Sequence, residues 1–255
     1  MLARERQAKI LSMLKAKGSV ATTDVSRDLG VSIETIRRDL LVLEQSGQLS
    51  RVHGGAVATG DMFSFHTLKD RIEERKDAKI NLCNVASTFV NDGDVILIDS
   101  GSTAIYFADA IKDKKVTVIT YSLDVFDRLK YSPNVSLILC GGHYLSDENC
   151  VHGSFTFDML DKLHVAKAFV FVSAISLKYG VCDFEKNVYA LQKKSIEIAD
   201  EVYILADSEK YEKHGLLKLC DVNDKYYFIT DTGLNDKYKD AYIEKGVKLI
   251  VGDRK

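Results

Sequence analysis

The sequence predicts an α/β protein in two parts: a small helical domain, followed by a larger domain with a doubly wound, mostly parallel sheet. Short helical patterns separated by glycines, followed by a hairpin pattern, fill the first 58 residues. From Lys76 onward, β-branched apolar runs alternate with amphipathic stretches. A length of 255 residues with 46% hydrophobic and 28% charged residues suits two globular domains.

The first 50 residues carry the pattern of three short helices. A first helix is expected over residues 4–16, ended by Gly18, and a second between an N-cap at Thr22 or Thr23 and Gly30. A third helix should begin after the N-cap Ser32 and end at Gly47, with a core stripe formed by Ile33, Ile36, Leu40 and Leu43. Two helices joined by a tight glycine-containing turn form the helix-turn-helix layout.

A hairpin is expected directly after the third helix. Residues 48–52 and 56–58 flank the tripeptide His53-Gly54-Gly55, whose glycines permit positive φ in a tight turn. This is the wing of a winged helix-turn-helix, so we predict such a domain over residues 1–58. The mostly charged stretch 59–75 is the expected linker, and residues 76–255 the α/β domain.

Six β-branched runs are the expected strands of the second domain, at residues 95–98, 116–119, 135–139, 168–172, 202–205 and 227–229. Amphipathic stretches at 102–111, 122–130 and 187–199 are expected helices between them. Strands alternating with helices predict parallel pairing, with the helices covering both faces of the sheet.

The third helix of the predicted winged helix-turn-helix domain, residues 1–58 and called the head below, has the composition of a DNA-binding surface. Opposite its core stripe it presents hydroxyl and guanidinium groups, which bind base edges and phosphates. Arg51 and His53 would extend this surface from the wing. The predicted DNA-binding residues are therefore Ser32, Glu34, Thr35, Arg37, Arg38, Arg51 and His53. The alternative is a solvated helix face with ion pairs between neighbouring turns.

Charge distribution favours the first interpretation. Residues 1–60 hold nine Lys and Arg against six Asp and Glu, a net charge of +3. The whole chain has a net charge of −2, so residues 61–255 together carry −5. A basic head on an acidic body suits a chain that offers one end to a polyanion.

A second candidate site follows the strand expected at 95–98. The segment Asp99-Ser100-Gly101-Ser102-Thr103 joins that strand to a helix, so backbone N–H groups and the helix dipole converge where an anion can bind. The carboxyl ends of parallel strands are the ligand-binding edge of open α/β sheets. Ser and Thr at this position are also ordinary helix N-caps.

Other strand ends add candidate ligand-binding groups. Tyr121 follows the second strand, Gly141 and Gly142 follow the third, and Lys210 lies beyond the fifth, where its ammonium suits a phosphate. An exposed, solvated lysine is the alternative for Lys210. The predicted effector-binding residues are Asp99, Ser100, Gly101, Ser102, Thr103, Tyr121, Gly141, Gly142 and Lys210.

Two strings of the head together resemble the DeoR family of bacterial transcription regulators: Val31-Ser-Ile-Glu-Thr-Ile-Arg-Arg-Asp-Leu40 and Arg51-Val-His-Gly-Gly-Ala56. The resemblance extends over nearly the whole chain. It implies a double-stranded DNA operator and a sensor domain similar to ribose-5-phosphate isomerase and glucosamine-6-phosphate deaminase, which answers a phosphorylated sugar or a related metabolite. The matching sensor positions are 99–103, Gly141-Gly142, Gly153 and 206–208 with Lys210.

The sensor domain also departs from the family pattern. Tyr121 stands where the family commonly has Asn, and Ser173-Ala-Ile-Ser176 replaces a glycine-rich strand end. No acid is evident beside Asn187, before the helix expected there. These departures indicate an intact phosphate loop beside an altered sugar-recognition side.

Several classes of protein and site are excluded. The five cysteines are odd in number, widely spaced and without a C-x-x-C pair, which favours buried free thiols in a reducing cytosol over disulfides or zinc. No apolar run approaches the ~20 residues of a membrane span, and the N-terminus lacks a signal-peptide pattern. We expect a cytoplasmic protein with no metal, cofactor or membrane partner.

The resulting prediction is a DNA-binding repressor of carbohydrate-metabolism genes that is not an enzyme. One head rarely gives enough affinity for DNA, so we expect a homo-oligomer, a dimer or a tetramer. The first alternative is a sugar-phosphate isomerase-like enzyme with an attached DNA-binding head, with Asp99 or Asp183 as base. The second is a protein-interaction module with a vestigial helix-turn-helix.

Overall fold

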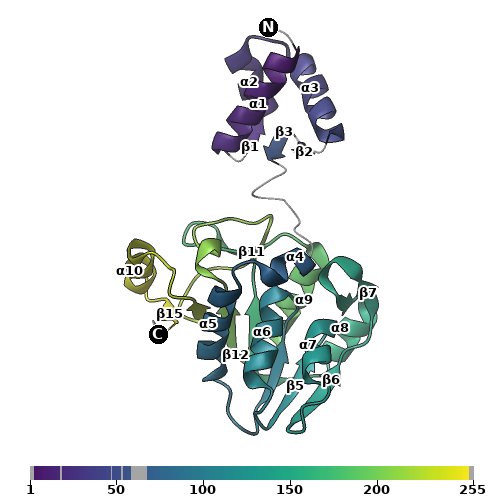
Figure 1. Ribbon diagram of the computed structural model, residues 1–255, viewed down its shortest axis with the longest axis vertical. Helices are drawn as coiled ribbons and strands as arrows, with labels where there is room; N and C mark the ends of the chain where they lie inside the picture. The colour runs from purple at the N-terminus through teal and green to yellow at the C-terminus, as the bar shows by residue number, and fades with distance from the viewer. Residues whose placement is uncertain (1–2, 18, 47, 53, 59–67, 253–255) are drawn as a thin grey trace. The chain divides into compact units, whose positions relative to one another are not determined.

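The computed structural model describes residues 3–17, 19–46, 48–52, 54–58 and 68–252. The chain forms two compact units, residues 1–66 and 67–255 (Figure 1). The expected linker 59–75 lies partly outside the described residues. Its described part begins with helix α4 (Leu68–Glu73), which belongs to the second unit.

Three helices form the first unit: α1 (Ala3–Lys17), α2 (Thr22–Leu29) and α3 (Ile33–Gln45). Gly30 ends α2 in the left-handed conformation, at φ 64°, which glycine adopts at little cost. The helices enclose one small core, made of Ile10, Leu14, Val20, Val25, Ile36, Leu40, Leu43, Leu49 and Ala56.

Two details of the helical prediction are wrong. Ile33 is 41% exposed and is not part of the core, because it opens α3 beside the buried face that Ile36, Asp39 and Leu40 occupy. Thr22 begins α2 instead of capping it; Ala21 holds the N-cap position and makes no side-chain cap.

The wing is a three-stranded antiparallel sheet in the order β1-β3-β2, with β1 (Ser19–Ala21), β2 (Leu49–Val52) and β3 (Gly55–Ala58). The hairpin β2–β3 matches the expected wing, whereas β1 was not expected. A Cβ atom at Gly55 would lie 2.1 Å from the carbonyl oxygen of Val20, so only glycine allows β1 and β3 to approach this closely. Gly18, Gly47 and His53 lie outside the described residues.

The second unit is built on a seven-stranded parallel sheet in the order β15-β14-β12-β9-β4-β5-β6. All six expected strands are present, and β15 is an additional edge strand. The strands are β4 (Val95–Ile98), β5 (Val116–Thr120), β6 (Val135–Leu139), β9 (Val165–Phe171), β12 (Ala199–Leu205), β14 (Tyr227–Thr230) and β15 (Lys248–Val251).

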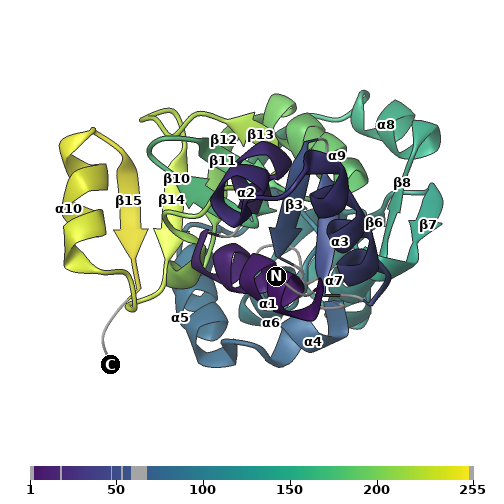
Figure 2. The same ribbon diagram turned by 90° about the horizontal axis from the view of Figure 1, so that it is seen from above.

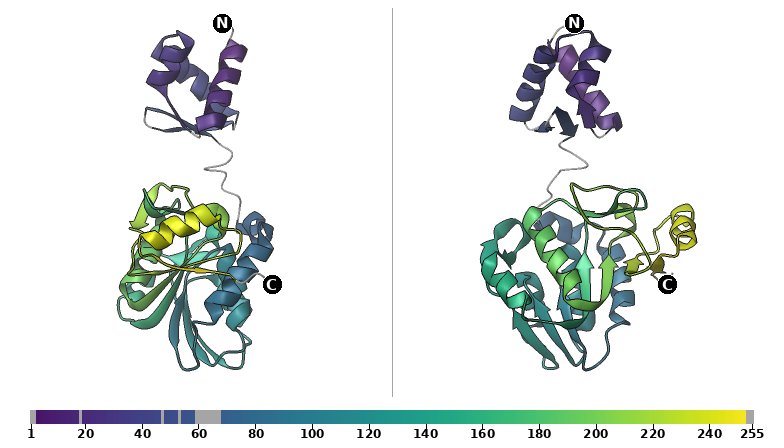
Figure 3. Two further views of the ribbon diagram at one scale, coloured as in Figure 1. Left: turned by 90° about the vertical axis from the view of Figure 1, so that its left-hand side faces the viewer. Right: turned by 180° about the vertical axis from the view of Figure 1, so that it is seen from behind.

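Helices cover both faces of this sheet, which confirms the doubly wound α/β fold (Figures 1 and 3). One core lies under α5 (Lys76–Ser87), α6 (Ser102–Ile111) and α7 (Leu123–Leu129). The other lies under α8 (Ser154–Leu160), α9 (Lys186–Glu197) and α10 (Asp236–Glu244). Figure 2 shows α10 beside the edge strand β15.

Short strands that were not expected surround the carboxyl edge of the sheet. They are the antiparallel set β10 (Ala174–Ser176), β11 (Gly180–Asp183) and β13 (Leu217–Cys220), and the hairpin β7 (His143–Leu145) and β8 (Cys150–His152). The short helices η1 (Ser146–Glu148) and η2 (Ser208–Lys210) lie in the same loops.

Two further observations concern the described residues. No helix among them combines the length and apolar composition needed to cross a bilayer. The five cysteines are free; four are buried and Cys220 is half-buried.

The strand order fixes where a ligand site is expected. From β4 the chain proceeds through β5 to β6 on one side, and from β9 through β12, β14 and β15 on the other. The topological switch point therefore lies between β4 and β9, and open α/β sheets bind ligands in the crevice beyond such a point. Asp99 follows β4 there, and Val172 follows β9.

Candidate DNA-binding face and effector site

The N-terminal end of α3 is fixed by its own side chains. The Ser32 hydroxyl accepts a hydrogen bond from the Thr35 backbone N–H at 3.2 Å and lies 2.8 Å from the Thr35 hydroxyl. This N-cap leaves other first-turn N–H groups directed outward, where they favour an anion. Ser32 is exposed and Thr35 half-buried.

The basic side chains of the predicted DNA-binding face are exposed. Arg37 pairs with Glu34 at 3.5 Å, with both side chains about two-thirds exposed or more, and Arg38 is exposed beside them. Exposed pairs of this kind are worth about 0–1 kcal/mol, so they yield readily to a phosphate. On the wing, Arg51 lies 3.7 Å from Glu44 and is likewise exposed. His53 is outside the described residues.

One buried ion pair links α3 to α1. Asp39 is 4% exposed on the core side of α3 and binds the guanidinium of Arg6 and the amide of Gln7, both on α1. Sequence reasoning missed this contact, because it did not distinguish the buried Asp39 from the exposed residues Arg37 and Arg38 that precede it. Its spacing from Ile36 and Leu43 is the available signal, since it places Asp39 on the buried stripe.

In the second unit, the segment 99–103 forms the expected turn from β4 into α6. Gly101 caps α6 at φ 122°, a conformation that other residues rarely adopt, and a Cβ atom there would meet no neighbour within 4 Å. Ser102 and Thr103 open the helix, and among the described residues their backbone N–H groups donate to no acceptor. A helix start with this geometry binds anions.

Asp99 lies beneath this turn and is fully buried. One carboxylate oxygen accepts from the Ser100 N–H at 2.7 Å and the Tyr121 hydroxyl at 2.6 Å. The other accepts from the Phe171 N–H at 3.0 Å and the Gln192 amide at 3.1 Å. Burial raises the pKa of Asp99 to about 7, against the lowering effect of these four donors.

Tyr121 is also fully buried, with its hydroxyl between Asp99 and Ser195. Asp99 and Tyr121 therefore brace the turn from below, and neither side chain reaches its outer surface. The structure thus brings Asp99 and Tyr121, both predicted to bind the effector, into contact with each other beneath the turn and not on its ligand-facing side.

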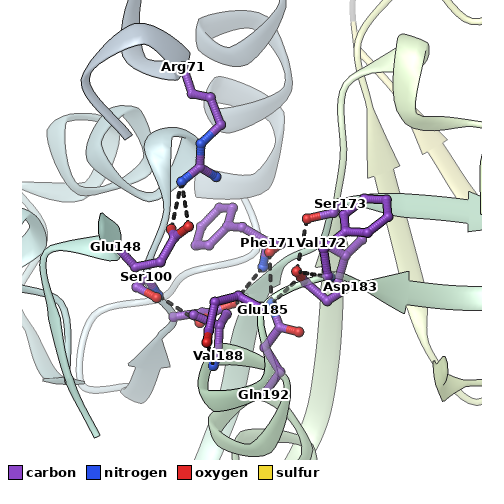
Figure 4. A network of polar contacts seen from close by, with 12 residues as sticks. Arg71, Ser100, Glu148, Phe171, Val172, Ser173, Asp183, Glu185, Val188 and Gln192 are labelled. Carbon is purple, nitrogen blue, oxygen red and sulfur yellow. Dashed lines mark hydrogen bonds and ion pairs between the residues drawn. The ribbon is translucent and has the colours of Figure 1, made fainter. Parts of the chain in front are cut away.

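Gln192 of α9 extends the support (Figure 4). Its amide nitrogen lies 3.0 Å from the Phe171 carbonyl and 3.0 Å from Asp183 at the end of β11, in addition to Asp99. Asp183 also accepts from the Ser173 hydroxyl at 3.0 Å. The network joins β4, β9, β11 and α9 directly under the switch point.

Lys210 lies at the same edge, in η2. Its ammonium donates to the Val172 carbonyl at 3.0 Å, at the end of β9. The buried Lys79 of α5 is close enough to matter electrostatically: burial, and then the charge of Lys210, lower the pKa of Lys79 to about 8. Arg75, which sequence reasoning did not name, lies beside Lys210, with its guanidinium 3.3 Å from Asp207 and 2.9 Å from the Ser208 hydroxyl.

The predicted glycines Gly141 and Gly142 differ in their packing. Both are exposed, but a Cβ atom at Gly142 would lie 2.2 Å from the Thr156 hydroxyl and 2.6 Å from the His152 carbonyl, whereas one at Gly141 would meet nothing within 4 Å. Thr156 donates to the Gly141 carbonyl at 2.8 Å, so this turn is tied to α8.

Family comparisons decide the identity of the chain. Residues 6–60 match the DeoR-like helix-turn-helix domain, and residues 74–232 match the DeoR C terminal sensor domain. The chain belongs to the DeoR family. It is a helix-turn-helix transcriptional regulator.

Two curated relatives match nearly the full length of the chain. The uncharacterized HTH-type transcriptional regulator YulB of Bacillus subtilis (strain 168) is 32% identical over 249 residues, which cover 98% of this chain and 96% of YulB. The lactose phosphotransferase system repressor of Lactococcus lactis subsp. lactis is 30% identical over 245 residues, 94% of this chain and 95% of that protein.

Among solved structures, ribose 5-phosphate isomerase A from Methanocaldococcus jannaschii is similar with a TM-score of 0.40 and 20% identity. The likeness covers 54% of this chain and 55% of the isomerase.

The DeoR regulator has an acid before α9, contrary to our expectation. The helix begins at Lys186, one residue earlier than predicted, and Glu185 is its N-cap, accepting from the Val188 N–H at 2.6 Å. The expectation was wrong because it placed the helix start at Asn187. Glu185 and Asp183 act on Glu148: burial, with the charges of these two carboxylates, raises the pKa of Glu148 despite the opposing effect of Arg71.

Proposed function

We propose that this DeoR regulator represses genes for the uptake or breakdown of a sugar, and that a phosphorylated sugar or related metabolite controls it from the carboxyl edge of the sheet. The observation that carries the proposal is the free first turn of α6 behind Gly101, located at the topological switch point. The relative from Lactococcus lactis, named as a repressor of a lactose system, supports the sugar class.

The proposal assigns different tasks to the predicted effector residues. The backbone of Gly101, Ser102 and Thr103 would hold the phosphate, while the Ser100 N–H stays bound to Asp99 beneath the turn. Lys210 would be the counter-charge of the phosphate, with the exposed turn of Gly141 and Gly142 beside it. Asp99 and Tyr121 would hold the turn in shape from beneath, because both are fully buried.

On the first unit, the proposal keeps the predicted DNA contacts. Arg37 and Arg38 of α3 would bind base edges, Ser32 and Thr35 a phosphate, and Arg51 the backbone beside the wing. Glu34 holds Arg37 in the free protein and would release it to DNA. The partner is a double-stranded operator, and we propose that the regulator binds it as a dimer or a tetramer.

We further propose that the chain is not an enzyme. An isomerase needs a base that can reach its substrate. Asp99, the first candidate, has a pKa near 7, but all its hydrogen bonds are internal and its side chain is fully buried. Asp183, the second, is 5% exposed and bound by Ser173, Phe184 and Gln192.

Two measurements test the proposed function. Retardation of a duplex from the regulator's own upstream region should be abolished or strengthened by one member of a panel of hexose and pentose phosphates. The same compound should raise the melting temperature, since a ligand at 100 times its Kd stabilises by about 2.7 kcal/mol. No shift with any phosphorylated sugar contradicts the effector class, and turnover of one of them would establish the enzyme.

A further inference from the structure

Ile33 is a large aliphatic side chain in an otherwise polar neighbourhood. It is the first residue of α3 and is 41% exposed, between the exposed residues Ser32 and Glu34. Ile36, by contrast, is fully buried. The core of the head therefore does not account for an isoleucine at position 33.

Isolated apolar side chains on a surface are common, so exposure alone decides nothing. Leu41 and Val42 of α3 are exposed to similar extents, 39% and 47%. Position separates the three. The N-terminal residues of a recognition helix contact base edges; Ile33 opens the first turn, whereas Leu41 and Val42 belong to the third.

The chemistry of the major groove supplies the partner. Base edges there are hydrogen-bonding groups, with one apolar exception, the C5 methyl group of thymine. Arg37 follows Ile33 by four residues, one turn along the same side of α3. We propose that Ile33 contacts a thymine methyl group of the operator and determines sequence specificity there, beside the hydrogen bonds made by Arg37.

Uracil tests this contact, because it differs from thymine only by the methyl group. Each thymine of the footprinted upstream site is replaced in turn by uracil, and affinity is measured with the full chain. For the wild type, one position in each half-site should cost about fourfold, the effect of burying one methyl-sized group. The Ile33→Ala variant should bind the thymine and uracil duplexes equally, while Ile33→Val keeps part of the difference.

Val42→Ala is the matched control, since it truncates an equally exposed aliphatic residue of α3 in the third turn. It should retain the full wild-type loss at the same thymine. The proposal is overturned if no thymine shows the loss, if Ile33→Ala retains it, or if Val42→Ala removes it.

A second inference comes from α4, the first described element after residues 59–67, and rests on the proposed function. The C-terminal end of α4 is held from below: the Lys79 ammonium donates to the Arg71 and Glu74 carbonyls, the latter at 2.7 Å. The Tyr106 hydroxyl of α6 donates to the Ile72 carbonyl at 2.9 Å. The helix that follows the effector turn is thus bonded directly to α4.

One side chain of α4 reaches the acidic edge. A single Arg71 nitrogen donates to both oxygens of Glu148 at 2.7 Å, and the two side chains are 28% and 13% exposed (Figure 4). Asp183 and Glu185 add negative potential at Glu148. A bound phosphate would add further negative potential. The cation of α4 that reaches this edge is Arg71, through its pair with Glu148.

We propose that the Arg71–Glu148 pair is the switch through which an anion at the 100–103 turn acts on α4. The anion competes with Glu148 for the guanidinium, so α4 is held differently in the free and the bound protein. Coupling of this kind requires that the ligand favour one of the two arrangements.

The test compares Glu148→Gln with the wild type, using the panel sugar phosphate that gives the largest thermal shift, with inorganic phosphate alongside. Glutamine keeps the shape but removes the competing charge. We expect the variant to bind ligand and operator, to have a ligand-free operator affinity displaced toward the ligand-bound wild-type value, and to respond at least fivefold less to ligand.

Asp161→Asn is the matched control, since it breaks the Lys194–Asp161 pair between α8 and α9, away from α4. It should respond as the wild type does. A Glu148→Gln variant with the full wild-type response overturns the switch alone. If no phosphorylated compound changes the melting temperature or the operator affinity of the wild type, the proposed function is overturned, and the switch with it.

Discussion

At the scale of single residues, the two arginines of α3 carry the first prediction. Arg37→Ala and Arg38→Ala should each weaken operator binding by about 1–3 kcal/mol, because each removes a guanidinium from the face opposite the core. Fluorescence anisotropy with the upstream duplex measures the loss. Arg128→Ala is the control, an exposed arginine paired with Asp109 in the other unit. Unchanged affinity in both α3 variants would contradict our assignment of this face.

Asp99 carries the second prediction, on pH. Its folded pKa, about 7, lies above the ~3.9 of an unfolded chain. The folded state therefore binds the Asp99 proton more tightly, and this stabilisation is complete below pH 4 and lost as pH rises through 7. The urea-derived free energy of unfolding should fall between pH 5 and 8 by up to a few kcal/mol more in the wild type than in Asp99→Asn. Parallel pH profiles would show that Asp99 does not titrate there.

Two of the residues that sequence reasoning missed, Asp39 and Arg75, have partners that are distant in the chain. Asp39 meets Arg6 from 33 residues away, and Arg75 meets Ser208 from 133. Arg75 also adopts a left-handed φ of 48° to face Asp207 at 3.3 Å. The spacing of Asp39 from Ile36 and Leu43 indicates its burial, but no local pattern identifies the partner of either charge.

At the scale of elements, local patterns sufficed for six of the seven strands of the main sheet. The six expected strands are β-branched runs in the interior of the sheet or at its β6 edge, and the turn from β4 into α6 follows from its glycine and hydroxyl residues. The pattern failed for short strands. β1, β10 and β13 have three or four residues each and, unlike the equally short β4 and β14, they are not runs of β-branched or aromatic residues. Their pairing is decided by tertiary contacts.

Gly141 and Gly142 give a matched pair of predictions for one turn. Gly142→Ala should destabilise the protein by about 1–3 kcal/mol, because the new Cβ atom must displace Thr156 and break its bond to the Gly141 carbonyl. Gly141→Ala meets open space and should change stability by less than about 0.5 kcal/mol. Thermal unfolding of the two variants compares them, and equal melting temperatures would show that the turn relaxes freely.

At the scale of the whole molecule, the basic head and acidic body predict a strong effect of salt. Phosphate contacts release counterions, so the logarithm of the binding constant should fall linearly with the logarithm of salt concentration, with a slope of about −0.9 for each contact. Removing Arg51 at the wing should reduce the slope by about one contact and weaken all duplexes alike. A loss confined to the operator would instead make Arg51 a base-contacting residue.

The proposed oligomer gives the last prediction, on operator geometry. Two heads related by a two-fold axis require two half-sites on one face of the duplex, separated by about 10–10.5 base pairs or a multiple of that spacing. Inserting about 5 base pairs between the half-sites moves one of them to the opposite face, so affinity should fall toward that of a single half-site. Inserting a full turn should restore much of it, because the second half-site returns to the same face. Gel retardation measures the affinity for the three duplexes, and sedimentation equilibrium measures the oligomeric state of the free protein. A monomer in solution, or equal affinity for all three duplexes, would mean that each head binds on its own.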